Sequence, residues 1–310
     1  MKVVEVYERW VEFHFPFVKE STRMAYLSHW KNHVKPFFGD MEVESITTDV
    51  LEDFVERLVE GGRMNRSTAG DALMLVRQLV KYAGTRLNLR CFVLGEVRYP
   101  LGVRGKIERK ERLTKGEVKK LIEYVKANPS PVNIGILVMV NSGIRIGEAS
   151  GLRFEDFDLE KGVFTVNRII QRIYDTSLKH TKILIGTPKT KSSHREIPLV
   201  PELRRMVSAY KKISRPDYYV LTCSPHPLEP RTFRNHIYAA QKKAGIDEPV
   251  HPHGLRHSFA SMLVENGVDV VTVSGILGHS NTTTTLNMYC HASDDEKRKA
   301  ISSMLRKLKI

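Results

Sequence analysis

The spacing of hydrophobic residues divides this chain into two parts with different folds. In residues 1–90 the apolar positions recur three and four residues apart, as they do on amphipathic helices. In residues 91–112 Pro100 and Gly102 interrupt the chain, a charged run follows, and no apolar face repeats. We therefore predict a helical domain at 1–90, a basic interdomain linker at 91–112 and a second domain at 113–310, which suits a chain of 310 residues.

Four apolar stripes predict four short helices that form a small bundle in the first domain. The second helix is expected to begin after a cap at Ser21 and to stop at Pro36. The third is expected to end at the Gly61-Gly62 pair and the fourth at Gly84. The stripes are formed by Val3, Val4, Tyr7, Trp10 and Val11, by Met24, Leu27, Trp30 and Val34, by Leu51, Phe54, Val55 and Leu58, and by Ala69, Ala72, Leu73, Val76, Val80 and Ala83.

The second domain is predicted to be mixed, which makes the whole chain mainly α with a small antiparallel β-sheet. Its first helix has a capping-box start, because Thr114 is followed three residues later by Glu117. Helices are expected to dominate the end of the chain, including a basic helical tail at 294–310. The other predicted segments are helices at 114–127, 132–142 and 145–151, and strands at 163–170, 183–187 and 195–199.

The net charge favours a large polyanion as partner. Lysine and arginine number 49 against 35 aspartates and glutamates, a formal charge of +14. This balance indicates DNA, RNA or an anionic membrane surface, although a merely basic protein would have the same composition. The longest apolar stretch, 134–140, is far shorter than the ~20 residues of a membrane-spanning helix. Three widely spaced cysteines and an N-terminus without an apolar signal sequence are typical of a cytoplasmic protein.

The segment SGIRIGE contains the first candidate for a phosphate-binding residue. Arg145 lies where one apolar helix ends at Gly143 and another begins. A guanidinium at such a junction can offer several donors to a phosphate in a fixed geometry. The same residue can instead form a surface ion pair with Glu148, three positions later, and taken alone the motif favours this second interpretation.

Three histidines and an arginine lie together in the segment HPHGLRH. On a helix His253 and Arg256 share one face, where they would supply a proton carrier and a second phosphate-binding group. Two other interpretations stay open, namely a core histidine with satisfied hydrogen bonds and a metal site formed by His251, His253 and His257. The metal site is less favoured because the cluster contains no carboxylate and no cysteine.

Two further segments carry candidate reactive groups. His279 lies at a corner after Gly278, and Tyr289 follows a run of threonines. A single tyrosine near the end of a chain is usually structural. Lys189 and Lys191 lie in the turn expected between the last two strands. Such a hairpin tip most often lies in solvent, but it could enter a DNA groove and deliver a proton.

Together these segments meet the needs of phosphodiester cleavage. Attack by an oxygen nucleophile places negative charge on the non-bridging phosphate oxygens, and two arginines with histidines can stabilise that charge without a metal. A tyrosine phenol can be the nucleophile and would keep the bond energy in a phosphotyrosine, while a lysine can protonate the leaving 5′ oxygen. The sequence has no P-loop signature, and this scheme needs no cofactor.

The chain resembles the tyrosine recombinase family, specifically the integrases of phages and conjugative elements, over nearly its whole length. The motifs that carry the resemblance occur in the family's order and approximate spacing: SGIRIGE, TPKTKSSHREIPL, HPHGLRHSFAS and LGHSNTTTTLNMYCH. The resemblance implies a site-specific recombinase with an N-terminal, SAM-like core-binding bundle and an α+β catalytic domain. It also implies double-stranded DNA as the substrate and a homo-tetramer on that DNA.

The resemblance assigns a role to each candidate residue. Tyr289 would be the nucleophile, leaving a 3′-phosphotyrosine and a free 5′-hydroxyl. Lys189 resembles the general acid, with Lys191 as the alternative because the length of the turn makes the alignment ambiguous. Neither a metal nor a nucleotide cofactor is implied. The remaining implied roles are phosphate binding by Arg145 and Arg256, acid–base catalysis by His253, donation to the transition state by His279, and support of the first arginine by Glu148.

The resemblance also bears on partners. The tail at 294–310 would dock on a neighbouring protomer or else pack on its own core. An accessory protein that controls the direction of recombination would be a further partner, and no membrane is expected. Many integrases have an additional N-terminal domain for arm-type DNA sites. Here the predicted bundle begins almost at Met1, which puts arm-site binding in doubt and leaves two alternatives open, a simpler recombinase or a truncated chain.

Three other functions fit parts of the same pattern. A metal-dependent DNA nuclease would use His251, His253 and His257 and would stop on addition of a chelator. A non-catalytic DNA-binding protein would keep the fold but form no covalent adduct with DNA. An enzyme that relaxes DNA like a topoisomerase would use similar chemistry with little demand on DNA sequence.

Overall fold

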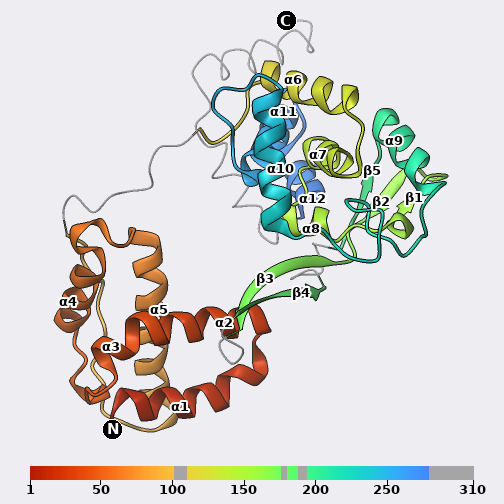
Figure 1. The fold of residues 1–310 in the computed structure, drawn as a ribbon. Coiled ribbons are helices and arrows are strands. Elements are labelled where there is room, and N and C mark those ends of the chain that lie inside the picture. Colours follow the sequence, from red (N-terminus) through yellow and green to blue (C-terminus); the bar gives the residue numbers. More distant parts are fainter. Residues whose placement is uncertain (101–109, 176–179, 188–193, 279–310) are drawn as a thin grey trace, which may run out of the picture. The chain divides into compact units, whose positions relative to one another are not determined.

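The computed structural model describes residues 1–100, 110–175, 180–187 and 194–278. The chain divides into two compact units, each with a hydrophobic core of its own (Figure 1). One unit consists of Met1–Glu108 and Ile173–Lys182, and the other consists of Arg109–Arg172 and Ile183–Ile310.

The first unit is built from helices, and the four predicted apolar stripes are confirmed as helical. The first, third and fourth stripes lie on α1 (Val3–His14), on α4 (Thr48–Val59) and on α5 (Arg66–Arg86). The second begins on α2 (Glu20–His29) and continues into the π-helical turn that follows it, where Trp30 and Val34 lie. Short helical turns connect these elements: η1 (Phe15–Phe17), the π-helical η2 (Trp30–Val34), α3 (Lys35–Phe38), η3 (Val43–Ser45) and η4 (Glu60–Gly62).

Three of the helix boundaries predicted for this unit are wrong. α2 begins at Glu20, so Ser21 lies inside the helix and does not cap it. Pro36 lies in the first turn of α3. Backbone N–H groups in the first turn of a helix have no acceptor within the helix, so a proline there costs no hydrogen bond and does not end the helical segment. α5 passes through Gly84 to Arg86. A glycine inside a helix costs only about 1 kcal/mol, which is too little to end a long helix by itself.

Aromatic side chains fill the core of the first unit. Tyr7 stacks on Trp30 with ring centroids 3.8 Å apart, and Phe54 is almost completely buried. Residues at the start of the predicted linker contact this bundle. Val97 is buried in the same core, and the Arg98 guanidinium donates hydrogen bonds to both carboxylate oxygens of Glu52, at 3.0 and 2.9 Å.

The second unit surrounds one apolar helix. Most residues of α7 (Pro131–Ser142) are buried, and the helix contacts α6 (Lys115–Ala127), α9 (Pro201–Lys211) and α11 (Pro252–Glu265) (Figure 1). The capping box predicted at Thr114 is present at the start of α6. The other helices are α8 (Ile146–Ser150), α10 (Pro230–Lys243) and α12 (Val270–Leu277). Within the described ranges, no helix combines the length and the apolarity that crossing a membrane requires.

The strands form two small sheets. In the first, β2 (Val163–Thr165) lies between β1 (Phe157–Asp158) and β5 (Glu196–Pro198), and both pairings are antiparallel. The second sheet pairs β3 (Ile169–Asp175) with β4 (His180–Gly186).

Two expectations about the strands are corrected by this topology. The single strand predicted at 163–170 is two strands, β2 and the start of β3. The hairpin predicted around Lys189 is wrong, because β4 and β5 belong to different sheets. Buried Phe164 faces buried Ile197 in the register, so the apolar side of β5 is matched to β2 and not to β4. Residues 188–193 and the predicted tail lie outside the described residues.

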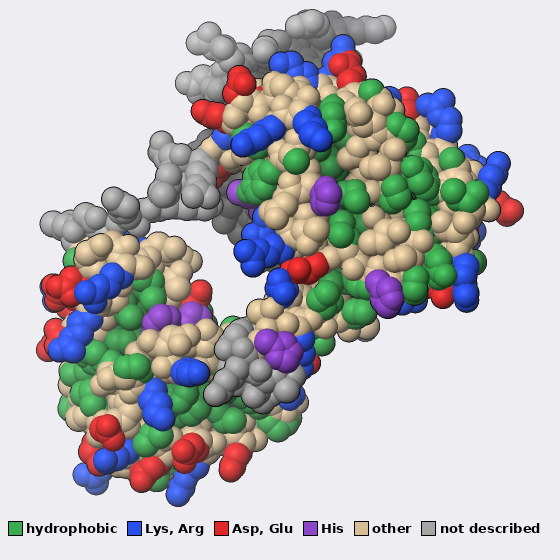
Figure 2. Space-filling model, viewed as in Figure 1, with side chains coloured by type: hydrophobic (Ala, Val, Ile, Leu, Met, Phe, Trp, Pro, Cys, Tyr) green, Lys and Arg blue, Asp and Glu red, His purple; other side chains and the backbone are tan. Residues whose placement is uncertain are grey.

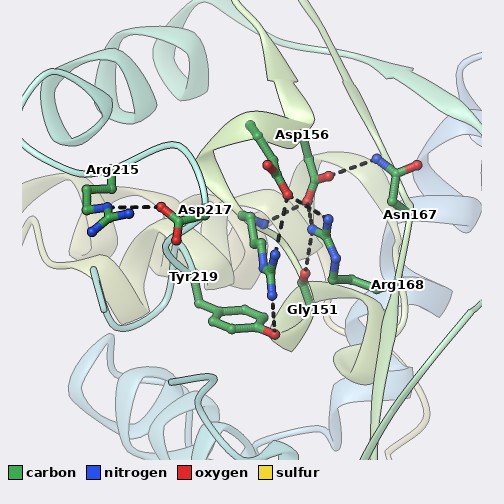
Figure 3. Close-up of polar contacts among 9 residues, drawn as sticks. Gly151, Asp156, Asn167, Arg168, Arg215, Asp217 and Tyr219 are labelled. Carbon is green, nitrogen blue, oxygen red and sulfur yellow. Dashed lines mark hydrogen bonds and ion pairs between the residues drawn. The ribbon is translucent and has the colours of Figure 1, made fainter. Parts of the chain in front are cut away.

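A buried carboxylate connects the turn before β1 with the segment that leads into β3 (Figure 3). Asp156 is buried and accepts hydrogen bonds from the Arg153 backbone N–H at 2.7 Å, from Arg168 Nη1 at 2.7 Å and from Asn167 Nδ2 at 2.8 Å. Burial raises the pKa of this carboxyl, and these bonds act in the opposite direction. The network therefore fixes the path of the chain into β3, the strand against which α8 packs.

Candidate active site

Two glycines, Gly143 and Gly147, allow the segment around Arg145 to pack closely against α11, α12 and β3. Gly143 ends α7 in the left-handed conformation, with φ 63°, and the chain turns there toward α8. A methyl group at this position would lie 2.6 Å from Phe259 Cδ1 and 2.7 Å from Leu277 Cδ2. A methyl group on Gly147 would lie 2.6 Å from a backbone oxygen of β3. Glycine is therefore required at both positions for Arg145 to stand where it does.

Arg145 and Glu148 form the ion pair that the sequence allowed, but one partner is buried. Arg145 Nη1 lies 3.0 Å from Glu148 Oε1, and the Arg145 backbone N–H donates to Oε2 at 3.0 Å. The Glu148 side chain is 2% exposed, whereas that of Arg145 is 37% exposed. The carboxylate thus caps α8 and orients Arg145, whose guanidinium is partly open to solvent.

A second guanidinium, from a distant part of the sequence, contacts the same carboxylate. Arg195 Nη2 lies 3.3 Å from Glu148 Oε2, and Arg195 Nε donates to the backbone oxygen of Ile276 at 2.6 Å. The Arg195 side chain is 8% exposed. Burial lowers the pKa of this guanidinium and the charge of Glu148 opposes that effect, so the pair is a largely buried ion pair.

Arg256 is the most deeply buried arginine of the site. It lies on α11 and is 2% exposed. Its Nη1 donates to the backbone oxygen of Gly143 at 2.9 Å, and its Nη2 donates to that of Leu277 at 2.9 Å. Burial, and then the charge of Arg145, lowers the pKa of this guanidinium. Backbone oxygens at the ends of α7 and α12 therefore hold a cation whose charge no carboxylate contacts directly among the described residues.

The site as a whole carries an excess of positive charge. Glu148 pairs with two guanidiniums, those of Arg145 and Arg195, and a third, that of Arg256, lies close enough for its pKa to be affected by all three of these charges. Such an arrangement favours a bound anion, because an anion would lower the repulsion among the cations. A phosphodiester has the charge and the oxygen geometry that fixed guanidiniums bind well.

The histidines of the HPHGLRH segment lie at the start of α11. His251 precedes the helix, and its Nδ1 accepts a hydrogen bond from the Gly254 N–H at 3.0 Å, which requires an unprotonated nitrogen. His253 as a whole residue is exposed, but its ring packs edge-on against that of His257 with centroids 4.6 Å apart, a contact that shields part of the ring from water. Desolvation of the ring, and then the charges of His257 and Arg256, lower the pKa of His253 to about 4. His253 is therefore neutral at pH 7 in the free protein.

The structure brings together four of the residues singled out in the sequence: Arg145, Glu148, His253 and Arg256. Glu148 pairs with Arg145, Arg256 donates to the backbone oxygen of Gly143 two residues before Arg145, and His253 lies on α11 three residues before Arg256. In the part of the chain that is described, no three His, Cys, Asp or Glu side chains are arranged to hold a metal ion. The other predicted site residues, Lys189, Lys191, His279 and Tyr289, lie outside the described residues.

Arg195 is a residue of the site that the sequence did not predict. It directly precedes a short strand in the motif TPKTKSSHREIPL, where a charged residue is expected to lie in solvent. Its partner, Glu148, is 47 residues away in the chain. The motif itself was a signal, since Arg195 belongs to one of the four segments that carry the family resemblance, but no local pattern pairs it with Glu148.

Comparisons with known proteins identify the family. The model of the phage integrase family matches residues 111–296, and the model of the N-terminal SAM-like domain of phage integrases matches residues 2–59. The first of these matches covers more than half of the chain. The chain therefore belongs to the phage integrase family, and it is a site-specific tyrosine recombinase, an enzyme that cleaves and rejoins DNA.

Individual relatives agree with this assignment. The chain is 28% identical to the tyrosine recombinase XerD of Bifidobacterium longum over 83% of this chain and 81% of that protein. It is 30% identical to the transposase of transposon Tn916 from Enterococcus faecalis, over 59% of this chain and 48% of the transposase. A solved structure of the Tn1549 transposon integrase, in complex with transposon right end DNA, has the same fold, with a TM-score of 0.79 at 21% identity over 100% of both chains.

Replacing Glu148 by glutamine is expected to lower the free energy of unfolding by roughly 1–3 kcal/mol, because two guanidiniums would lose their common counter-charge. Urea unfolding of the full chain measures this change. Glu123→Gln is the matched control, since Glu123 is 63% exposed and lies 3.9 Å from Lys119. A surface pair of this kind contributes about 0–1 kcal/mol. Equal losses in the two variants would contradict the role given to Glu148.

His253 is expected to titrate in the free protein at about 4, well below the ordinary histidine value. Because the unfolded chain binds this proton at about pH 6.5, the folded state loses stability as the pH falls from that value toward the folded-state pKa. NMR of the imidazole carbons measures the titration directly. The unfolding free energy of His253→Gln should depend less on pH in this window than that of the unchanged protein. A normal titration of His253 would show that neither desolvation of its ring nor the neighbouring charges depress its pKa.

Proposed function

We propose that this recombinase cleaves double-stranded DNA through attack by Tyr289, without a metal or a nucleotide cofactor. The phenol oxygen forms a bond to phosphorus while the bond from phosphorus to the 5′ oxygen breaks. The products are a 3′-phosphotyrosine and a free 5′-hydroxyl. Because the phosphotyrosine keeps the energy of the broken bond, a 5′-hydroxyl can attack it in the reverse reaction and restore an intact strand.

The other residues of the site have distinct parts in this reaction. Arg145 and Arg256 bind the non-bridging oxygens, whose charge grows in the transition state. His253 is neutral at pH 7 and can accept the phenolic proton. Lys189, or Lys191 in its place, protonates the leaving 5′ oxygen. His279 donates a hydrogen bond to the transition state, and Glu148 holds Arg145.

The observation that carries this proposal is a cluster of three guanidiniums, two of them paired with one buried carboxylate and the third held by backbone oxygens, beside a neutral histidine. Among the described residues the side chain of Arg145 makes one hydrogen bond, to Glu148. A guanidinium has five N–H donors, so a phosphate can bind to the others. The cluster supplies without a metal the fixed positive charge that phosphoryl transfer requires.

Binding to DNA accounts for the charge of the chain. The net charge is +14, and lysine and arginine side chains are spread over the face that Figure 2 shows. We expect contacts mostly to the phosphate backbone, with an affinity that falls as salt rises. Lambda integrase has been solved as a tetramer bound to a Holliday junction, and its fold matches this chain with a TM-score of 0.61 at 16% identity. A homo-tetramer on DNA is proposed here by analogy.

Each predicted domain has its own part in the proposed reaction. Residues 1–90 would bind one face of the DNA as a core-binding domain, residues 113–310 would hold the other face and perform the chemistry, and residues 91–112 would connect them. An accessory protein that sets the direction of recombination would act on this assembly. We place the protein with the DNA in the cytoplasm.

Trapping the covalent intermediate tests the whole proposal. The full chain would be incubated with a pool of nicked duplexes of randomised sequence, so that the short strand released by cleavage diffuses away and the adduct accumulates. Sequencing of the attached DNA gives the cleavage site, and mapping of the attached peptide gives the nucleophile. The expected result is a 3′-linked strand on Tyr289, formed equally well in the presence of EDTA. A chelator-sensitive cut without an adduct would instead support a metal-dependent nuclease.

Tyr289→Phe is expected to abolish the adduct and to leave DNA binding unchanged, because only the nucleophilic oxygen is lost. Denaturing gels measure the adduct, and mobility shifts with the duplex recovered above measure binding. An adduct that persists in this variant would refute the assignment of Tyr289. Loss of binding together with the adduct would mean that the phenol has a structural role.

Arg145→Lys is expected to slow adduct formation by roughly 10²–10³-fold, since one ammonium cannot contact both Glu148 and a phosphate in the geometry of a guanidinium. Single-turnover rates at saturating DNA measure the effect. Arg215→Lys is the control, because Arg215 is 70% exposed and pairs with Asp217. Near-normal rates for Arg145→Lys would count against its role at the phosphate.

A further inference from the structure

We propose that Arg195 is a positioning residue for the cleavage reaction, which couples the orientation of Arg145 to the end of helix α12. The inference rests on the proposed function, in which Arg145 binds the scissile phosphate. It adds a residue that does not itself need to touch DNA. Its contacts connect three segments that are far apart in the sequence: the start of α8, the start of β5 and the end of α12.

Two of the contacts of Arg195, one to a backbone oxygen and one to a carboxylate, determine how it would act. Nε and Nη2 lie on the same edge of a guanidinium, and here they donate to two different elements, Nε to the backbone oxygen of Ile276 at 2.6 Å and Nη2 to Glu148 Oε2 at 3.3 Å. A planar fork fixes the relative position of its two acceptors more strictly than a flexible ammonium does. Arg195 therefore sets the distance between the buried carboxylate and the last turn of α12.

On the side of α8, Arg195 limits the freedom of the carboxylate. Glu148 Oε1 receives Arg145 Nη1, while Oε2 receives Arg195 Nη2 and the backbone N–H of Arg145. Without Arg195, one of the two guanidiniums that hold this 2% exposed carboxylate is lost. The carboxylate could then rotate toward solvent, and the guanidinium of Arg145 would move with it.

On the side of α12, Arg195 and Arg256 act on adjacent backbone oxygens. Arg195 binds the oxygen of Ile276 and Arg256 binds that of Leu277. The last carbonyl groups of a helix lack helical partners and attract positive charge. Gly278 then ends the helix in the left-handed conformation, and the chain leads on to His279. Loss of Arg195 would release one of the two contacts that fix this point.

The contacts of Arg195, rather than its burial, set it apart from Arg145 and from the likewise buried Arg256, because it donates both to Glu148 and to the end of α12. Its side chain is 8% exposed, against 37% for Arg145. Its effect on cleavage should therefore pass through Glu148 and through the end of α12. A positioning residue of this kind acts on cleavage only through its neighbours. The effect of substituting Arg195 should therefore not add to the effect of substituting Glu148.

The test compares single-turnover rates of adduct formation in the full chain at saturating DNA. Arg195→Gln is expected to lower the rate constant by about 10²-fold, the size of effect that a displacement of ~1 Å at a reacting centre produces. Arg195→Lys, which keeps the charge but not the planar fork, should give a smaller loss. The concentration of DNA that gives half the maximal rate should stay unchanged in both variants.

A double substitution tests the route of the effect. If Arg195 acts through Glu148, then Arg195→Gln combined with Glu148→Gln should be no slower than the slower of the two single variants. Multiplicative losses would overturn the proposed coupling. A wild-type rate for Arg195→Gln would overturn the proposal altogether.

A control separates positioning from a general loss of stability. Arg77 also bridges two backbone oxygens, those of Leu94 and Gly95, but within the N-terminal bundle. Arg77→Lys should change the urea unfolding of the bundle and leave the cleavage rate at saturating DNA as it was. If rate losses in the Arg195 variants only follow their folded fraction, measured by circular dichroism, Arg195 is a structural residue and the proposal fails.

The outcome also separates this inference from the proposed function. If the unchanged protein forms no adduct, or forms one on a residue other than Tyr289, the proposed function fails whatever Arg195 does. If the adduct forms on Tyr289 and the Arg195 variants cleave normally, only the inference about Arg195 fails.

Discussion

Burial of the Glu148 carboxylate is the constraint on which the rest of the site depends. A carboxylate removed from water is very costly unless it is paired and hydrogen-bonded. Here the partners are the side chain and backbone of Arg145 together with Arg195. The requirement for pairing draws the start of β5 onto the start of α8, which no feature of either segment alone would demand. The architecture of the site follows from the need to satisfy one charge.

In the described part of the chain, backbone oxygens, rather than carboxylates, hold the other buried guanidinium of the site, that of Arg256. Arg256 is buried without a carboxylate partner in the described residues, and carbonyls at the ends of α7 and α12 receive its donors. Gly143 makes this possible, because a side chain there would collide with Phe259 and Leu277. Carbonyl oxygens hold a guanidinium in place without neutralising it, whereas a carboxylate would cancel its charge. The site thus keeps positive charge available in a fixed position, as electrostatic stabilisation of a transition state requires.

Patterns among residues three or four apart in the sequence predicted much of this structure. The features that were not predicted depend on contacts between residues far apart in the chain. The capping box at Thr114, the four helical stripes of the bundle and the pairing of Arg145 with Glu148 all depend on residues three or four apart. The pairing of β5 with β2, by contrast, depends on the match of Phe164 with Ile197 across the sheet. The role of Arg195 depends on a partner 47 residues away. A single sequence contains no direct signal for contacts between residues that are far apart in the chain.

In the free protein the guanidiniums of the site repel one another, and a bound anion would lower this repulsion. The like charges that repel lie on Arg145, Arg195 and Arg256. Desolvation of the ring first, and then neighbouring charges that include those of Arg256 and Arg145, lower the pKa of His253 and keep it neutral at pH 7. An anion placed among the guanidiniums would reduce the repulsion and would also raise the pKa of His253. Since a ligand that binds only the folded state stabilises that state, phosphate binding and the stability of the catalytic unit are linked. Acceptance of the phenolic proton then becomes easier once the phosphate is in place, which ties proton transfer to the presence of the substrate.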